Sequence, residues 1–400
     1  MTTALPHIKV LDLSRILAGP WASQMLADLG AQVIKVERPV SGDDTRRWGP
    51  PFIKSEQETP DAAYFHCANR GKQSIAVDIT KVAGQAIIKK LVLEADVLIE
   101  NYKVGGLKKH GLDYLSLSEL NPNLIYCSIT GFGQSGPWAH KAGYDAMIQG
   151  EGGLMSITGE PNGMPMKVGV ALVDVMTGLY SSNAILAALL ARQHTQKGQH
   201  IDIALLDVQM AALANQGMNY LTTGENPQRL GNAHPNIVPY QTFKTKDGAI
   251  ILAVGNDQQF AKFCSLVKND SLNNEKFLTN AQRVENREKL IQLLTPILLS
   301  ETSQWWIEQL EQLNVPCGAV NTIKQVVEHP QTRHREMIQE VQNQHGESIK
   351  TIANPIKLSA TPIQYVKAAP QLGQNTESLL SELGYDLESI QQLQQDGTVQ

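Results

Sequence analysis

The first third of the chain alternates short apolar runs with segments of helical spacing. Residues 8–13 and 32–37 are typical of strands, and residues 18–29 between them carry apolar side chains at helical intervals, which predicts a βαβ unit. The pattern then returns, with strands expected at 74–78, 96–100, 124–130 and 201–205 and helices at 85–94 and 207–221. This alternation favours an α/β fold with a parallel sheet covered on both faces, and ligands at the carboxyl ends of its strands.

Two domains are expected in a chain of 400 residues. The stretch 223–240 collects Gly, Asn and Pro and is the candidate linker between a large α/β part, 1–222, and a smaller α+β domain, 241–328. A further segment, 329–400, follows. Within these parts we expect a hairpin from 241–244 and 249–254, helices at 258–267 and 287–313, and short strands at 340–342 and 349–352.

Charge and composition exclude several classes of function. The formal net charge is −5 with no long block of one sign, which argues against nucleic acid or an anionic membrane as a partner. The four cysteines are far apart and have neither disulfide nor zinc spacing, and we expect no metal. The N-terminus lacks a secretory pattern, so a cytoplasmic protein is expected. The apolar stretch 168–190 is interrupted by polar groups and is interpreted as a buried helix.

One glycine motif resembles a dinucleotide fingerprint. Residues 131–136 spell GxGxxG directly after a predicted strand, but Pro137 and Gly143 make a poor helix start, and the fingerprint requires a helix there. We therefore interpret the motif as a tight turn beside a ligand. The motifs GxxxxGK[ST], HExxH and GxSxG do not occur in the sequence, so NTPase, zinc protease and serine hydrolase functions lose their usual support.

Charged residues near the predicted strand ends are candidate ligand contacts. Each is individually typical of a solvated surface, but together they make a composite phosphate site plausible, and they are Arg38, Arg70, Lys72, Lys103, Lys108 and Lys109. Arg15 and the pair Arg46-Arg47 suit a carboxylate clamp or a surface equally well. Asp174 begins a long apolar helix, where an Asp is usually a cap for unpaired amides. The same amides would otherwise give Asp174 a low pKa and hold a developing oxyanion.

Short motifs recur in a fixed order along nearly the whole chain. They are Val10-Leu11-Asp12-Leu13, Ala18-Gly19-Pro20, Asp28-Leu29-Gly30-Ala31, Lys35-Val36-Glu37-Arg38, Ser41-Gly42-Asp43, Glu100-Asn101, Gly131-Phe132-Gly133, Gly143-Tyr144-Asp145, Gly169-Val170-Ala171, Pro316-Cys317-Gly318 and Leu372-Gly373-Gln374-Asn375-Thr376. In these motifs the chain resembles the class III CoA-transferases, the family of formyl-CoA and carnitine CoA-transferases. Within the family its dicarboxylate branch, of the succinate-hydroxymethylglutarate CoA-transferase type, is the most similar.

The resemblance implies a chemistry as well as a fold. Asp174 would be the nucleophile that takes an acyl group as a mixed anhydride and then CoA as a thioester, without ATP or metal. Ile16, Arg38, Asn101 and Lys109 would contact CoA, and Tyr144 would be an active-site aromatic; Arg70 and Lys72 remain further candidates for CoA. For the acid substrate the candidates are Arg15, Arg46, Gly255, Asn256 and Gln258, the last three from a loop that closes over the intermediate in relatives.

The family fold would be a Rossmann-like large domain completed by residues 329–400, with 241–328 as the smaller domain between. Its members are intertwined homodimers, and coenzyme A or acyl-CoA is a substrate rather than a permanently bound cofactor. Two alternatives stay open. The family also contains 2-methylacyl-CoA racemases, but these place a His where this chain has Tyr144, which disfavours them. A non-catalytic CoA-binding protein would bind CoA without a covalent adduct on Asp174.

Overall fold

The structure, a computed structural model, describes residues 3–55 and 59–400. The chain folds into two compact units that each consist of more than one segment. Unit 1 comprises Met1–Gly152, Gly169–Ala212 and Pro330–Gln400, and unit 2 comprises Gly153–Val168 and Leu213–His329. The predicted linker, 223–240, lies within unit 2, and the predicted domain boundaries stay a prediction.

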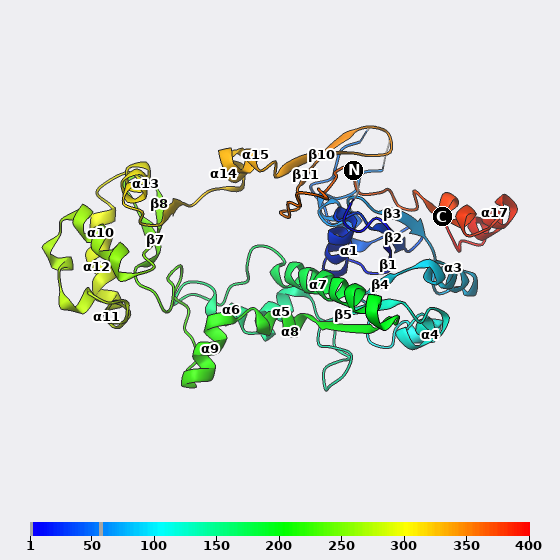
Figure 1. The fold of residues 1–400 in the computed structure, drawn as a ribbon, viewed down its shortest axis with the longest axis horizontal. Coiled ribbons are helices and arrows are strands. Elements are labelled where there is room, and N and C mark those ends of the chain that lie inside the picture. Colours follow the sequence, from blue (N-terminus) through cyan, green and yellow to red (C-terminus); the bar gives the residue numbers. More distant parts are fainter. Residues whose placement is uncertain (1–2, 56–58) are drawn as a thin grey trace. The chain divides into compact units, whose positions relative to one another are not determined.

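Unit 1 is built on a parallel sheet. Within the described residues the sheet has six strands in the order β3-β2-β1-β4-β5-β6, and every neighbouring pair is parallel (Figure 1). The strands are β1 (Lys9–Asp12), β2 (Gln32–Glu37), β3 (Gln73–Ala76), β4 (Val97–Glu100), β5 (Ile125–Thr130) and β6 (His200–Ala204). This is the Rossmann order, and it confirms the predicted α/β class. The order reverses between β1 and β4, where sheets of this type bind ligands.

Helices cover both faces of this sheet. Helices α1 (Ala18–Asp28) and α7 (Leu172–Thr195) pack against each other and share one apolar core with the sheet. The opposite core is closed by α3 (Val82–Glu94), α4 (Tyr114–Leu120), α16 (Thr376–Glu382) and α17 (Leu387–Gln395). By length and composition alone α7 is apolar enough to cross a membrane, yet it packs along α1, β5 and β6 as a core helix does.

The C-terminal segment lies against β3, one of the two edge strands of the sheet. The N–H of Asn375 donates to the Ser74 carbonyl over 2.9 Å, and the N–H of Ala76 donates to Oγ1 of Thr376 over 3.1 Å. The antiparallel pair β10 (Ile338–Gln342) and β11 (Ser348–Ile352) precedes these contacts, as predicted. The segment therefore completes the core of unit 1.

Unit 2 contains an antiparallel sheet with its own apolar core. The expected hairpin is confirmed as β7 (Tyr240–Lys244) and β8 (Ala249–Ala253), and β9 (Cys317–Ala319) adds a strand beside β8. The sequence predicts two long continuous helices, and both predictions are wrong because each region forms two helices. Residues 287–313 divide into α12 (Arg287–Leu298) and α13 (Ser303–Gln312), because the Thr302 side chain caps a new helix. Residues 207–221 divide into α8 (Leu205–Ala211) and α9 (Ala214–Thr223), where Ala214 has a left-handed φ of 46°.

The remaining helices are short, apart from α10. They are α2 (Ala63–His66), α5 (Asp145–Glu151), α6 (Leu154–Ile157), α10 (Asp257–Val267), α11 (Asn280–Glu285), α14 (Ile323–Glu328) and α15 (Pro330–His334), with 3-10 turns η1 (Asp44–Arg47), η2 (Lys108–His110), η3 (Asp270–Leu272) and η4 (Glu275–Phe277).

Candidate active site

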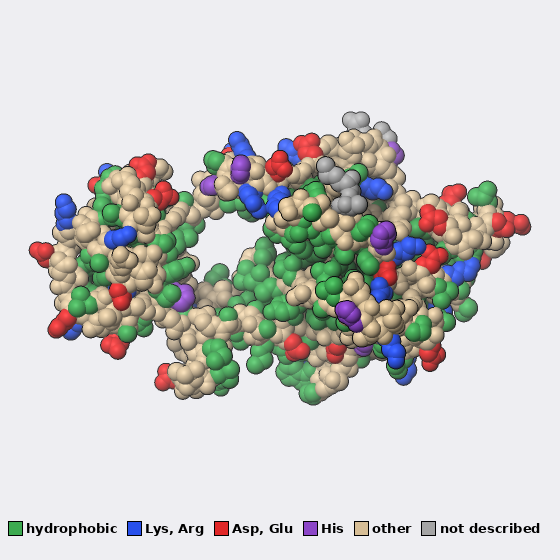
Figure 2. All heavy atoms as spheres, viewed as in Figure 1, with side chains coloured by type: hydrophobic (Ala, Val, Ile, Leu, Met, Phe, Trp, Pro, Cys, Tyr) green, Lys and Arg blue, Asp and Glu red, His purple; other side chains and the backbone are tan. Residues whose placement is uncertain are grey.

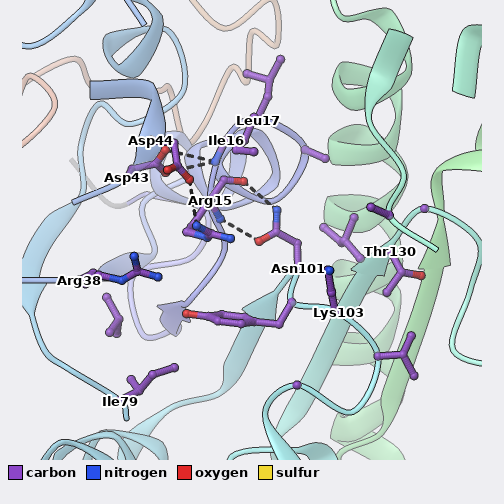
Figure 3. Close-up of a pocket in the computed structure, with 18 of the residues that line it drawn as sticks. Arg15, Ile16, Leu17, Arg38, Asp43, Asp44, Ile79, Asn101, Lys103 and Thr130 are labelled. Atoms are coloured by element: carbon purple, nitrogen blue, oxygen red, sulfur yellow. Dashed lines mark hydrogen bonds and ion pairs between the residues drawn. The ribbon is translucent and has the colours of Figure 1, made fainter. Parts of the chain in front are cut away.

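A cavity of about 490 Å³ opens in unit 1 at the carboxyl ends of β1, β2, β4 and β5. It therefore lies at the point where the strand order reverses, as the sheet topology requires of a ligand site. Residues from distant parts of the sequence meet around it (Figure 3). The sequence-predicted residues that line the cavity are Arg15, Ile16, Arg38, Asn101, Lys103, Lys109, Tyr144 and Asp174.

The turn after β1 is held in an unusual backbone conformation. Ile16 has a φ of 71°, which is strained for a β-branched residue. Its N–H lies 3.2 Å from each carboxylate oxygen of Asp43, and Asp43 is itself paired at 2.9 Å with Lys35, both side chains being fully buried. A buried ion pair thus stabilises the turn that delivers Arg15 and Ile16 to the cavity.

Arg15 and Asn101 join the ends of β1 and β4. The Arg15 N–H donates to Oδ1 of Asn101 over 2.9 Å, and Nδ2 of Asn101 donates back to the Arg15 carbonyl over 2.7 Å. The Arg15 guanidinium pairs with Asp44 at 2.9 Å, where both side chains are partly exposed (Figure 3). Asn101 therefore has a structural role, and the Arg15 guanidinium faces the cavity in a solvent-accessible pair.

Three exposed cations line the same cavity. Arg38 follows β2, Lys103 follows β4, and Lys109 lies in η2. Figure 3 shows the Arg38 and Lys103 side chains in the space beyond the strand ends. Among residues 3–55 and 59–400 none of the three forms an ion pair, so their charges are available to an anion. A phosphorylated ligand satisfies this arrangement.

Asp174 lies in the first turn of α7, but it is not the helix cap. Ala171 occupies the cap position, and the amides of the first turn are met by another carboxylate, that of Asp145. Oδ1 of Asp145 accepts from the N–H groups of Val173 at 2.8 Å and Asp174 at 3.3 Å. Both alternatives drawn from the sequence are therefore wrong, since Asp174 does not cap the helix and these two amides are not free to hold an oxyanion.

The charge state of Asp174 also differs from the expectation. Burial, and secondarily the nearby Asp145 carboxylate, raise the pKa of Asp174 to about 7. The low pKa expected at a helix start is wrong, because the amides that would lower it are bonded to Asp145. Burial, and secondarily the charge of Asp174, raise the pKa of the Tyr64 phenol in α2 to about 12. Tyr64 therefore remains a neutral hydroxyl at physiological pH.

The glycine motif after β5 forms a loop at the cavity, as predicted. No helix follows it before α5 within this described stretch, so the dinucleotide interpretation has no structural support. Gly131 and Gly143 cross so closely that a Cβ added to Gly131 would lie 2.5 Å from Cα of Gly143. The crossing brings the segment of Tyr144 and Asp145 against the end of β5.

Comparisons with known proteins show the family of the chain. Residues 5–376 match the sequence profile described as CoA-transferase family III. The chain belongs to CoA-transferase family III. It is 50% identical to a succinate–glutarate CoA-transferase of Agrobacterium fabrum, over 95% of both chains. It is 44% identical to a human succinyl-CoA:glutarate CoA-transferase, over 99% of this chain and 90% of the relative.

A solved structure gives the same result for the fold. A CaiB/BaiF family protein from Brucella suis is 49% identical and superposes with a TM-score of 0.86, covering 96% of this chain and 100% of the other. The chain is therefore an enzyme of the CoA-transferase type, and enzymes of this type use CoA thioesters as substrates.

Three cations predicted for the substrates of this CoA-transferase lie elsewhere in unit 1. Arg46 is buried and pairs with Glu37 at 2.6 Å and with Asp61. Arg70 is buried against Asp28 at 2.5 Å, and it also donates to the Ile352 carbonyl.

Lys72 is fully buried, and it donates to Asp12 over 3.1 Å and to Oδ1 of Asn69 over 2.8 Å. Burial lowers the pKa of Lys72 to about 8. The three cations Arg46, Arg70 and Lys72 have structural partners in this CoA-transferase and do not line the cavity, so we leave them out of the proposed site.

The predicted loop residues of this CoA-transferase lie in unit 2. Gly255 precedes α10, and its N–H donates to the Gln259 side chain over 2.8 Å. Asn256 is the N-cap of α10 and accepts from the Gln259 N–H over 2.9 Å, whereas Gln258 lies within the first turn. Their contact with a substrate stays a prediction.

Sequence reasoning missed Asp145 and Asp44 in this CoA-transferase. Asp145 was noted as part of the motif Gly143-Tyr144-Asp145 but received no role, because its partners lie 28 and 29 residues further along the chain. The signal in the sequence that could have indicated a role for Asp145 was its position directly after Tyr144, the predicted active-site aromatic. Within the described ranges no cluster of three His, Cys, Asp or Glu side chains is arranged to hold a metal ion.

Proposed function

We propose that this CoA-transferase moves CoA from succinyl-CoA to a free dicarboxylate, with glutarate as the first candidate. The observation that carries the proposal is the shared cavity, which is lined by Asp174 and by three cations that have no ion-pair partner among the described residues. The choice of acids is supported by the relatives, which are named as CoA-transferases of succinate and glutarate.

Asp174 would act as the nucleophile. Its carboxylate oxygen attacks the acyl carbon of succinyl-CoA, the C–S bond breaks, and CoA leaves as the thiolate while a mixed anhydride forms. The thiolate then attacks the carboxyl carbon of Asp174, which releases succinate and leaves an aspartyl-CoA thioester. The acceptor carboxylate attacks this thioester to form a second anhydride, and CoA thiolate takes the acceptor acyl group. Asp174 is regenerated, and no bond energy is drawn from ATP.

The cations at the strand ends would hold the nucleotide part of CoA. Arg38, Lys103 and Lys109 suit its phosphates because they are exposed and lack ion-pair partners among the described residues. The strained turn at Ile16 and the side chain of Asn101 would border the same groove. Tyr144 also lines the cavity and is more than half exposed, which suits contact with the acyl part.

The second carboxylate of the acid would be met by Arg15. Its guanidinium is partly exposed at the cavity and already holds one carboxylate, that of Asp44. The second carboxylate of a bound dicarboxylate could pair with the Arg15 guanidinium in the same way. Gly255, Asn256 and Gln258 stay as proposed contacts of the acid, on the resemblance alone.

The nucleophile is tested by Asp174→Ala with Asp207→Ala as the matched control. Asp207 is an exposed aspartate and, like Asp174, the third residue of a helix, but it does not line the cavity. With succinyl-CoA, the wild type and the control should form a hydroxylamine-sensitive CoA adduct that mass spectrometry detects, and Asp174→Ala should form none. Transfer retained in Asp174→Ala would sink the mechanism.

The acids are tested with a panel of C2 to C6 mono- and dicarboxylates as acceptors. Arg15→Ala should reduce kcat/KM for dicarboxylates much more than for monocarboxylates, and equal losses would remove the proposed role of Arg15. Deuterium appearing at the α-carbon of an acyl-CoA without acyl exchange would instead identify racemase chemistry.

We further propose a cytoplasmic homodimer. Hydrophobic side chains gather on the face of unit 1 that carries α7 (Figure 2), and the exposed ones include Val170, Leu179, Tyr180 and Leu190. A soluble monomer rarely leaves large apolar patches open, so a second copy is the expected cover. Light scattering coupled to gel filtration should give twice the chain mass of 43.9 kDa, and a monomer at micromolar concentration would contradict the proposal.

A further inference from the structure

Gln149 is a fully buried amide in α5, one turn after Asp145. The two side chains lie on the same face of the helix because they are four residues apart. Nε2 of Gln149 donates to Oδ2 of Asp145 over 2.7 Å and lies 3.5 Å from the Val170 carbonyl. The amide therefore connects α5 to the segment that leads into α7.

The other oxygen of Asp145 holds the start of α7. Oδ1 accepts from the N–H groups of Val173 and Asp174, while Oδ2 is bonded to Gln149. Because each oxygen has a different partner, the plane of the carboxylate is fixed from both sides. A buried amide has no water to replace a lost partner, so this bond has a strongly preferred geometry.

The geometry points to Gln149 as a positioning residue that orients the Asp145 carboxylate and, through it, the backbone of Asp174. This inference rests on the proposed function, because it matters only if Asp174 attacks the thioester. Misplacement of a reacting group by about 1 Å costs roughly 100-fold in rate. Gln149 is not itself among the residues that line the cavity.

The test measures single-turnover acylation of the full-length enzyme by succinyl-CoA, with intact-protein mass spectrometry as the readout. Gln149→Leu keeps a similar volume but removes the donor, and it should slow adduct formation roughly 10- to 100-fold. Its KM for succinyl-CoA should stay within about twofold, since Arg38, Lys103 and Lys109 are untouched. Thermal unfolding identifies a folding defect, and Gln149→Met, which is unbranched like Gln and also has no donor, replaces the Leu variant if that variant is misfolded.

Gln209→Leu is the matched control. Gln209 is also fully buried, lies in α8 against α5 and α7, and its amide has no hydrogen-bond partner in the part of the chain that the structure describes. This control should acylate at the wild-type rate, and a loss equal to that of Gln149→Leu would show a general packing effect and overturn the inference.

A double-mutant cycle separates positioning from structure. If Gln149 acts through Asp145, the variant Asp145→Ala/Gln149→Leu should react as slowly as Asp145→Ala alone, within about twofold. The acid limb of the acylation rate in Gln149→Leu should also shift, because the Asp145 carboxylate that acts on Asp174 loses the donor that fixes its second oxygen. The charge of Asp174 also acts on Tyr64, whose phenol is neutral over this pH range.

If the rate losses of Asp145→Ala and Gln149→Leu multiply in the double variant, Gln149 does not act through Asp145. An acid limb that is the same in Gln149→Leu and in the wild type would also contradict the positioning role of Gln149. Failure of this inference is distinguishable from failure of the proposed function. A wild-type enzyme that forms no adduct removes the function, whereas a wild-type adduct formed equally fast by Gln149→Leu removes only the role of Gln149.

Discussion

The pH dependence of acylation provides a direct test of the environment of Asp174. Only the ionised carboxylate attacks a thioester, and its pKa is raised to about 7. Below that pH the ionised fraction falls about tenfold per pH unit, so kcat/KM should rise roughly 100-fold between pH 5 and pH 8. A carboxyl with its ordinary pKa near 4 would give almost no change over that range.

The assay compares wild type with Asp145→Asn. The phosphate monoester of CoA also titrates, near pH 6, but it does so equally for both enzymes. The Asn side chain can still accept the α7 amides while its charge is gone, so the acid limb should move to lower pH by up to about one unit. The limb should stay above the ordinary carboxyl range, because burial is the larger cause of the raised pKa. A flat profile in the wild type, or coincident limbs in the two enzymes, would refute this reasoning.

Three other outcomes are expected. Asp44→Asn removes the carboxylate that pairs with Arg15, an exposed ion pair worth about 0.2–1 kcal/mol, so the KM of the dicarboxylate that Arg15 binds should fall by up to about fivefold in steady-state assays. An increase in this KM would contradict the idea that Asp44 competes with the substrate for Arg15. Arg38→Ala should raise the KM for succinyl-CoA about tenfold and weaken its dependence on salt, and an unchanged salt slope would remove Arg38 from the phosphate site. Lys35→Met leaves Asp43 buried without its partner and should lower the free energy of unfolding in urea by about 3–5 kcal/mol; a loss below about 1 kcal/mol would show that the pair does not stabilise the Ile16 turn.

Much of unit 1 follows from local sequence pattern. The strand at 32–37 was placed without error, and the other strands of the sheet lie within a residue or two of their predicted bounds. Period-2 and period-3.6 apolar patterns are strong where an element is buried on a sheet. The cations that follow β2 and β4 could be placed at one edge because parallel strands end together.

The wrong assignments depend on contacts between distant residues. Arg46, Arg70 and Lys72 resemble ligand contacts by position, yet their acidic partners lie 9 to 60 residues away, and spacing does not reveal which cation is neutralised. The expected low pKa of Asp174 failed for the same reason, because Asp145 reaches the α7 amides from another helix. The break before α13 did have a local signal, a threonine cap at residue 302.

The chain crosses between unit 1 and unit 2 at four places, after Gly152, Val168, Ala212 and His329. Neither unit therefore corresponds to one continuous stretch of coding sequence. A recombinant fragment that ends at one of these crossings would lack part of the hydrophobic core of one unit, or would include a segment whose partner segments in its own unit are missing. A protease that cuts one connection should leave the products associated, and they should separate only after denaturation.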